Sequence, residues 1–171
     1  CLQHARFETI GEQCREAGEL LWLAGRREPV TIAHFRLLDG SQLLPLVAQC
    51  LGQWTPTLRA FKLEAYDASS ISFLASLRQL TTLSVDVTLE VPGCVGLAVR
   101  SLQRLHSLRW NVRCEPFHGD LEVPLLPASL VHLEFHSTSS QVTFEGQASA
   151  LQKLQTLQLN GNDLSDGSLA V

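Results

Sequence analysis

Apolar residues recur along this chain in one spaced pattern, apolar-x-x-apolar-x-apolar. The last copy is Leu154/Leu157/Leu159, within the stretch LQKLQTLQLNGNDL at 151–164. Five earlier copies have the same spacing: Ile32/Phe35/Leu37, Leu58/Phe61/Leu63, Leu80/Leu83/Val85, Leu105/Leu108/Trp110 and Leu130/Leu133/Phe135. The third apolar positions of successive copies are 26, 22, 25, 25 and 24 residues apart. Because alternate residues of a strand face opposite ways, the pattern predicts six short strands, each buried on one side.

The segments between these copies have less uniform patterns. Apolar residues at helical spacing predict short helices over 41–51, 69–77 and 95–105. The segment 111–129 contains three prolines, which favour an extended or turn-rich crossing. Residues 141–145 alternate like a small strand. The chain is therefore expected to alternate between a strand and a variable return segment.

The last copy continues to Leu154-x-x-Leu157-x-Leu159-x-x-Asn162-x-Leu164, which resembles a leucine-rich repeat. Residues 160–169 resemble the ribonuclease-inhibitor subclass of that family. The resemblance implies an α/β leucine-rich repeat solenoid of about six repeats, with parallel strands on the concave face. The earlier repeats have no asparagine at the equivalent position. Such irregular arrays are typical of F-box, nucleotide-binding-receptor and ciliary proteins.

Two segments are expected along the chain. Residues 1–29 form an N-terminal helical cap or the end of a preceding domain, with good helix formers over 10–27 before Pro29. Residues 30–171 form the leucine-rich repeats. This array is expected to be truncated at its C-terminus, as a fragment of a longer protein.

The outward positions of the predicted strands form columns on the concave face. The second column contains Arg36, Lys62, Ser84, Arg109, Glu134 and Gln158, and the third contains Leu38, Glu64, Asp86, Asn111, His136 and Asn160. His34 and His132 belong to the first column. Mixed charges of this kind suit protein recognition, because complementary charges select the partner. The predicted partner-binding residues are Arg36, Lys62, Glu64, Asp86, Arg109, Asn111, His132, Glu134, His136 and Gln158.

Two groups of residues are candidates for other chemistry. His132, Glu134 and His136 alternate along one strand, but three such ligands would span too far for one zinc ion, so polar recognition is favoured, with a pH-sensitive contact as an alternative. Cys114 and His118 lack an orienting third group for nucleophilic catalysis. No cofactor or metal site is therefore expected. The tryptophans Trp22, Trp54 and Trp110 are expected to pack in the core, with the first two as alternative interface anchors.

Composition narrows the class of protein. The chain is 45% hydrophobic and 18% charged, as folded globular proteins are, and its net charge of −4 argues against a nucleic-acid partner. The sequence contains no run of about 18 apolar residues, so no membrane-spanning helix is expected. The five cysteines are odd in number and unclustered, which favours reduced thiols in an intracellular, cytoplasmic protein.

The family resemblance implies protein–protein interaction rather than enzyme activity. The expected role is a scaffold or adaptor in a larger intracellular assembly. Two alternatives stay open from the sequence: an F-box-type substrate receptor of a ubiquitin ligase, and a regulatory repeat domain of an enzyme or nucleotide switch that lies outside this segment.

Overall fold

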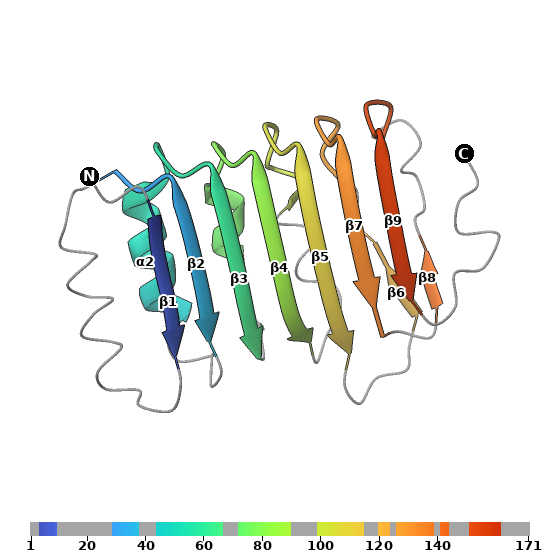
Figure 1. Ribbon diagram of the computed structural model, residues 1–171, viewed down its shortest axis with the longest axis horizontal. Helices are drawn as coiled ribbons and strands as arrows, with labels where there is room; N and C mark the ends of the chain where they lie inside the picture. Colours follow the sequence, from blue (N-terminus) through green and yellow to red (C-terminus); the bar gives the residue numbers. More distant parts are fainter. Residues whose placement is uncertain are drawn as a thin grey trace.

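Seven parallel strands form one sheet that runs the length of the molecule (Figure 1). The structure is a computed structural model, and it describes residues 4–9, 29–37, 44–66, 72–89, 99–114, 120–123, 126–138, 141–143 and 151–161. The strands stand in the order β1-β2-β3-β4-β5-β7-β9. Their bounds are β1 His4–Thr9, β2 Ile32–Leu37, β3 Ala60–Tyr66, β4 Thr82–Leu89, β5 Ser107–Cys114, β7 His132–Ser137 and β9 Thr156–Gly161. The predicted parallel strands are confirmed.

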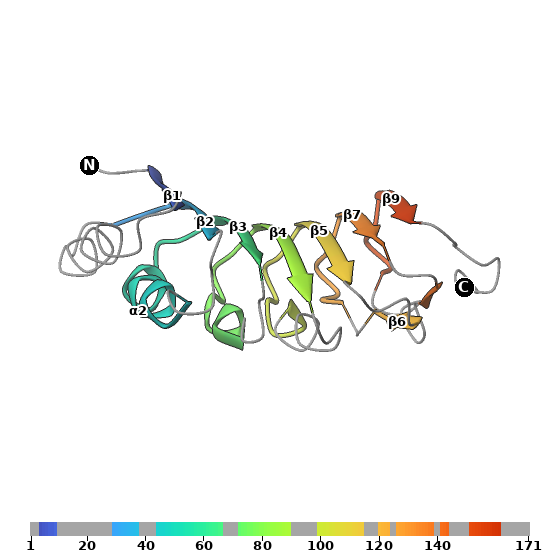
Figure 2. The same ribbon diagram turned by 90° about the horizontal axis from the view of Figure 1, so that it is seen from below.

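Short return segments cover one face of this sheet and leave the other bare of described elements (Figure 2). They include helix α2 (Leu44–Trp54), the 3-10 helix η2 (Ser72–Ser76), and strands β6 (Asp120–Glu122) and β8 (Gln141–Thr143), which pair in parallel. Helices were predicted for the first two segments and extended chain for the last two, and the structure agrees. Of the third predicted helix, over 95–105, the described part 99–105 is turns with one helical residue.

The core consists of apolar columns on the covered face of the sheet. In the register of the strands, Phe61, Leu83, Leu108 and Leu133 align in one column, and Leu63, Val85, Trp110 and Phe135 in the next. Each of these side chains is at most 2% exposed. Because each strand from β2 to β7 adds a side chain to both columns, the core is continuous between them. On β9, Leu157, expected to be buried, is 40% exposed, because no described strand lies beyond it.

Aromatic rings reinforce this core at two places. Phe35 stacks on Trp54 with ring centroids 6.4 Å apart, and it meets Phe61 at 5.9 Å. Trp110 meets Phe135 edge to face at 5.5 Å. The prediction that Trp54 and Trp110 pack in the core is confirmed, since they are 2% and 0% exposed. Trp22 lies outside the described residues.

The register of β2 on β3 shows that the buried positions of the first apolar copy, Ile32/Phe35/Leu37, were assigned wrongly. Phe35 lies beside Leu63 and not beside Phe61, so the buried positions of this unit are Val30, Ala33 and Phe35. Ile32, expected to be buried, is 37% exposed. The error arose because Ile32 matched the apolar pattern better than the small Ala33 did. The third buried positions of the first two units are therefore 28 residues apart, from Phe35 to Leu63.

The segment 1–29, expected to be a helical cap, includes strand β1. This strand pairs in parallel with β2, with Phe7 in register with Phe35, so the sheet begins at His4 and not after residue 29. The helix expected over 10–27 lies outside the described residues. Within the described part of the chain, no helix is long and apolar enough to cross a membrane.

Candidate functional site

The candidate site is the bare face of the sheet, called here the open face. Alternate residues of each strand point to it, because side chains alternate along a strand. Register places three rows across the strands. The first row is Ile32, Ala60, Thr82, Ser107, His132 and Thr156; the second is His34, Lys62, Ser84, Arg109, Glu134 and Gln158; the third is Arg36, Glu64, Asp86, Asn111, His136 and Asn160.

Glu64 on β3 is the centre of a cationic cluster at one end of the open face. Its Oε1 lies 3.3 Å from Nε2 of His34 and its Oε2 lies 3.3 Å from Nε of Arg36, both on β2. Lys62, two residues earlier on β3, also pairs with Oε1. The hydrogen bond from Lys62, together with the charges of Lys62 and His34, holds the pKa of Glu64 below its ordinary value of 4.5, and partial burial opposes this only in part.

The lowered pKa of Glu64 predicts a defined pH dependence of stability. A carboxylate with a depressed pKa in the folded state contributes stability above its ordinary pKa and loses that contribution as the pH falls through the folded value. We expect Glu64→Gln to destabilise the protein near pH 7 and to make progressively less difference below about pH 4. Urea unfolding of both proteins across this range measures the effect. A difference that grows on acidification would contradict the assignment.

Asp86 forms the second cluster, on strands β4 and β5. Its Oδ2 accepts a hydrogen bond of 3.0 Å from Nδ2 of Asn111, the residue beside it in register. Its Oδ1 lies 3.6 Å from a guanidinium nitrogen of Arg113. Asn111 and Arg113 alternate along β5, so both side chains lie on the open face. Asp86 is thereby held in place by one neutral and one charged partner.

Glu134 is the centre of the third cluster, over β5, β7 and β9. Its Oε1 lies 3.5 Å from Nε of Arg109 and 3.0 Å from Nε2 of His136. The same nitrogen of His136 lies 3.2 Å from Nδ2 of Asn160. A chain of polar contacts therefore links Arg109 to Asn160 across three strands. The side chain of Arg109 is 60% exposed and that of Glu134 is 30% exposed, so both are within reach of a partner.

The two histidines of β7 have different neighbours. Nδ1 of His132 lies 3.1 Å from Oγ1 of Thr156 on β9, whereas His136 contacts Glu134. Within the described ranges, no three His, Cys, Asp or Glu residues are arranged to hold a metal ion. Cys114 is the last residue of β5, and its side chain, like His118, lies outside the described part.

The structure brings most of the predicted residues together. Nine of them, all except Gln158, make a side-chain contact on the open face: Arg36, Lys62, Glu64, Asp86, Arg109, Asn111, His132, Glu134 and His136. Gln158 is exposed beside Glu134 in register. Arg36, predicted in the column of Lys62, instead stands in the row of Glu64, because the register of the first unit is shifted by two. Four contributors were not among the predicted site residues: His34, Arg113, Thr156 and Asn160. His34 was assigned only to the first column, and Arg113 follows from extending the alternation of β5 by two residues.

No family model, curated protein or solved structure matches this chain. The geometry of the sheet and its open face therefore carries the functional argument.

Proposed function

We propose that this chain is a leucine-rich repeat solenoid that recognises other proteins, acting as a scaffold or adaptor in a larger intracellular assembly. The spacing of the apolar copies and their resemblance to leucine-rich repeats support the solenoid. The packing also supports the solenoid, because the strands that contact each other extensively are neighbours in the sheet. An array in which each unit packs on its neighbours presents a long, continuous surface for a partner. The proposed role is binding rather than catalysis.

The observation that carries this proposal is the order of the side chains on the open face. This face has no covering element among the described residues, yet its charged side chains make cross-strand contacts in three clusters. Side chains held in this way lose less conformational entropy when a partner docks. Buried Cys50 is a free and unreactive thiol, because burial raises the pKa of its side chain.

The test exchanges one charge pair on the open face. Arg109→Glu combined with Glu134→Arg keeps opposite charges across β5 and β7 but reverses the pattern that a partner meets. Because exposed ion pairs contribute about 0–1 kcal/mol, we expect the thermal midpoint to stay within a few degrees of wild type. Capture of native partners is expected to fall at least about ten-fold, because reversed charges repel the complementary surface.

The measurement is quantitative mass spectrometry of proteins that co-purify with each form from the same lysate. Gln49→Glu combined with Gln53→Arg is the matched control, because it also leaves the net charge unchanged and places its two charges on the exposed side of helix α2, away from the open face. Proteins retained by the control and lost with the exchanged pair are the open-face partners. If the folded exchange variant captures the same proteins at the same level, the open face is not the binding surface.

A further inference from the structure

The strand-entry edge, defined as the residues directly before strands β3, β4, β5, β7 and β9, has an unusual charge. It consists of residues 55–59, 77–81, 99–106, 126–131 and 151–155. These segments contain five of the thirteen lysines and arginines and none of the seventeen aspartates and glutamates. The rest of the chain has eight of the former against all seventeen of the latter. Within these described segments, the charged side chains at the edge of an acidic protein are therefore all basic.

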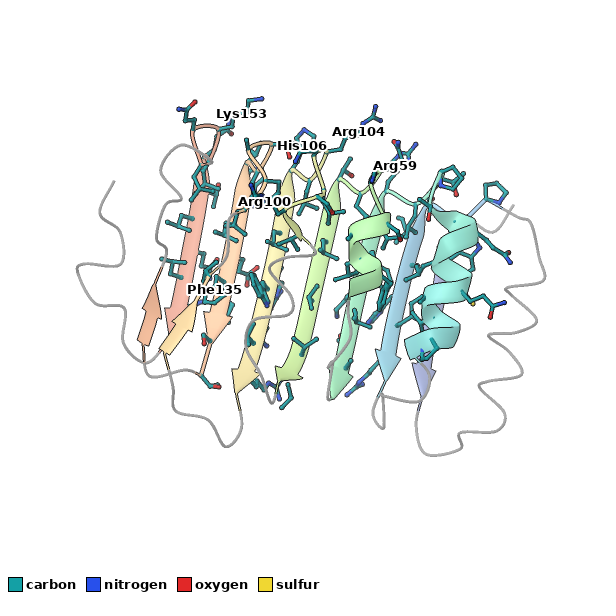
Figure 3. The ribbon with its side chains drawn as sticks, turned by 180° about the vertical axis from the view of Figure 1, so that it is seen from behind. Arg59, Arg100, Arg104, His106, Phe135 and Lys153 are labelled. Carbon is teal, nitrogen blue, oxygen red and sulfur yellow. The ribbon has the colours of Figure 1, made fainter. Side chains whose placement is uncertain are left out.

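The basic side chains of this edge are exposed. They are Arg59, Arg78, Arg100, Arg104 and Lys153, together with His106. Figure 3 shows Arg59, Arg104, His106 and Lys153 along the edge where the strands begin, with Arg100 just below. The repeated turn behind them is regular, because the carbonyls of Thr31, Arg59, Thr81, His106 and Val131 each accept two amides of the next unit. The backbone thus holds this row of cations at the spacing of the strands.

The cations of the edge differ from those of the open face in their partners. On the open face, Arg36, Lys62, Arg109 and Arg113 each pair with a carboxylate. At the edge, the arginines bind neutral oxygens instead: Arg59 Nη1 donates to the carbonyls of Pro56 (3.1 Å) and Leu58 (3.3 Å), and Arg104 Nη1 donates to Oε1 of Gln79 (2.8 Å). Among the described contacts, none joins an edge cation to a carboxylate. Arg59 and Arg104 are thus held by neutral oxygens, with no carboxylate partner among the described residues.

We propose that the strand-entry edge binds an acidic, extended protein segment. Arginine guanidinium groups match carboxylates in shape, and a nitrogen already bound to a backbone or amide oxygen fixes the orientation of the group. The edge from β3 to β9 covers four strand spacings, or about 19 Å. Arg59, Arg104 and Lys153 stand two strands apart from one another, at intervals of about 10 Å. An extended chain in the polyproline-II conformation rises about 3.1 Å per residue and has three residues per turn, so carboxylates at every third residue face the same side and match these three cations.

A protein segment fits this edge better than a nucleic acid or a membrane does. The row of cations is only one unit deep and about 19 Å long, which suits about six residues of peptide. A nucleic acid or a membrane presents a longer anionic surface than this row can contact. This surface is separate from the open face, and its role does not depend on the function proposed for that face.

The test is binding of a fluorescein-labelled peptide of about ten residues with glutamate at every third position, measured by anisotropy at low salt. The edge triple variant is Arg59→Gln, Arg104→Gln and Lys153→Gln. Its matched control removes three cations from the open face: Arg36→Gln, Lys62→Gln and Arg109→Gln. Both triples change the net charge equally. We expect the edge triple to lose at least about ten-fold in affinity and the control to stay within about two-fold, because three exposed ion pairs are lost only in the first.

Other outcomes overturn the proposal. An equal loss in both triples would mean attraction by net charge alone. If the edge triple binds the peptide with unchanged affinity, or if the wild type does not bind it, the strand-entry edge is not a binding site for acidic segments. Tighter binding of single-stranded RNA or of phosphatidylserine vesicles than of the peptide would assign it to another class of partner. Should a triple fail to fold, Arg104→Gln with Lys153→Gln is compared with Arg109→Gln with Arg113→Gln. The wild-type affinity must also fall as salt rises, since exposed pairs are screened.

Discussion

Replacing Trp110 with alanine is expected to lower the free energy of unfolding by about 3–5 kcal/mol. The indole is 0% exposed, fills the middle of the buried column between Val85 and Phe135, and packs edge to face on the phenyl ring. Alanine leaves a cavity that neighbouring strands cannot close, because each is fixed by its own ladder of backbone hydrogen bonds. Urea unfolding followed by far-ultraviolet circular dichroism measures the loss.

Trp110→Phe is the matched control for this prediction. The indole Nε1 is buried and has no hydrogen-bond partner among the described residues. Phenylalanine removes that unpaired donor, which offsets part of the packing loss, so we expect a cost of about 1–2 kcal/mol. If Trp110→Ala lowers the free energy of unfolding by less than about 1 kcal/mol, the indole does not contribute to core stability as argued.

Replacing Phe61 with alanine is expected to cost about 3–5 kcal/mol as well, for a different reason. Phe61 is 2% exposed and joins two elements, with its ring 5.9 Å from that of Phe35 on β2 and 6.5 Å from that of Phe73 on the return segment η2. Its loss removes contacts of both the preceding strand and the covering helix. Phe61→Leu, which keeps most of the apolar volume, is expected to cost less than about 2 kcal/mol.

The Phe61 variant also tests the proposed repeat organisation. In an array whose units contact only their neighbours, destabilisation spreads mainly to adjacent units. We expect hydrogen exchange to quicken in β2, β3 and β4 of Phe61→Ala before it does so in β7. An equal loss of protection in every strand would indicate one cooperative unit and would argue against a linear array.

Much of the fold could be predicted because the apolar spacing is dense and regular. Six of the seven strands of the main sheet were predicted from copies such as Leu80/Leu83/Val85. A position that is buried in every unit is apolar in every unit, so the apolar residues recur at a regular spacing. Strand β1 was missed because the helix formers after residue 10 dominated the interpretation of 1–29. The first unit was misaligned because a buried alanine, Ala33, lacks the bulk that marks an inward position.

The sequence predicted most of the residues that lie on the open face, but it did not predict which of them contact one another. Strand alternation places Glu64, Asp86 and Glu134 on one surface from their positions alone. Their partners depend on which residues stand side by side in adjacent strands. Arg36 pairs with Glu64 only because the register of β2 differs by two residues from the expected one. A two-residue shift keeps a side chain on the same face and changes its neighbour.

The apolar spacing was enough to predict strands with one buried and one polar face, because side chains alternate along a strand, and the resemblance to leucine-rich repeats added that the strands run parallel. Which charges neutralise one another depends on how the strands lie side by side. Residues such as Arg59, Arg104 and Lys153 are more than forty residues apart along the chain and show no pattern there. They form a row because successive turns stack at the same edge of the sheet. Charge pairing depends on the distances between side chains of different units. Those distances are set by how the units stack and not by the local sequence.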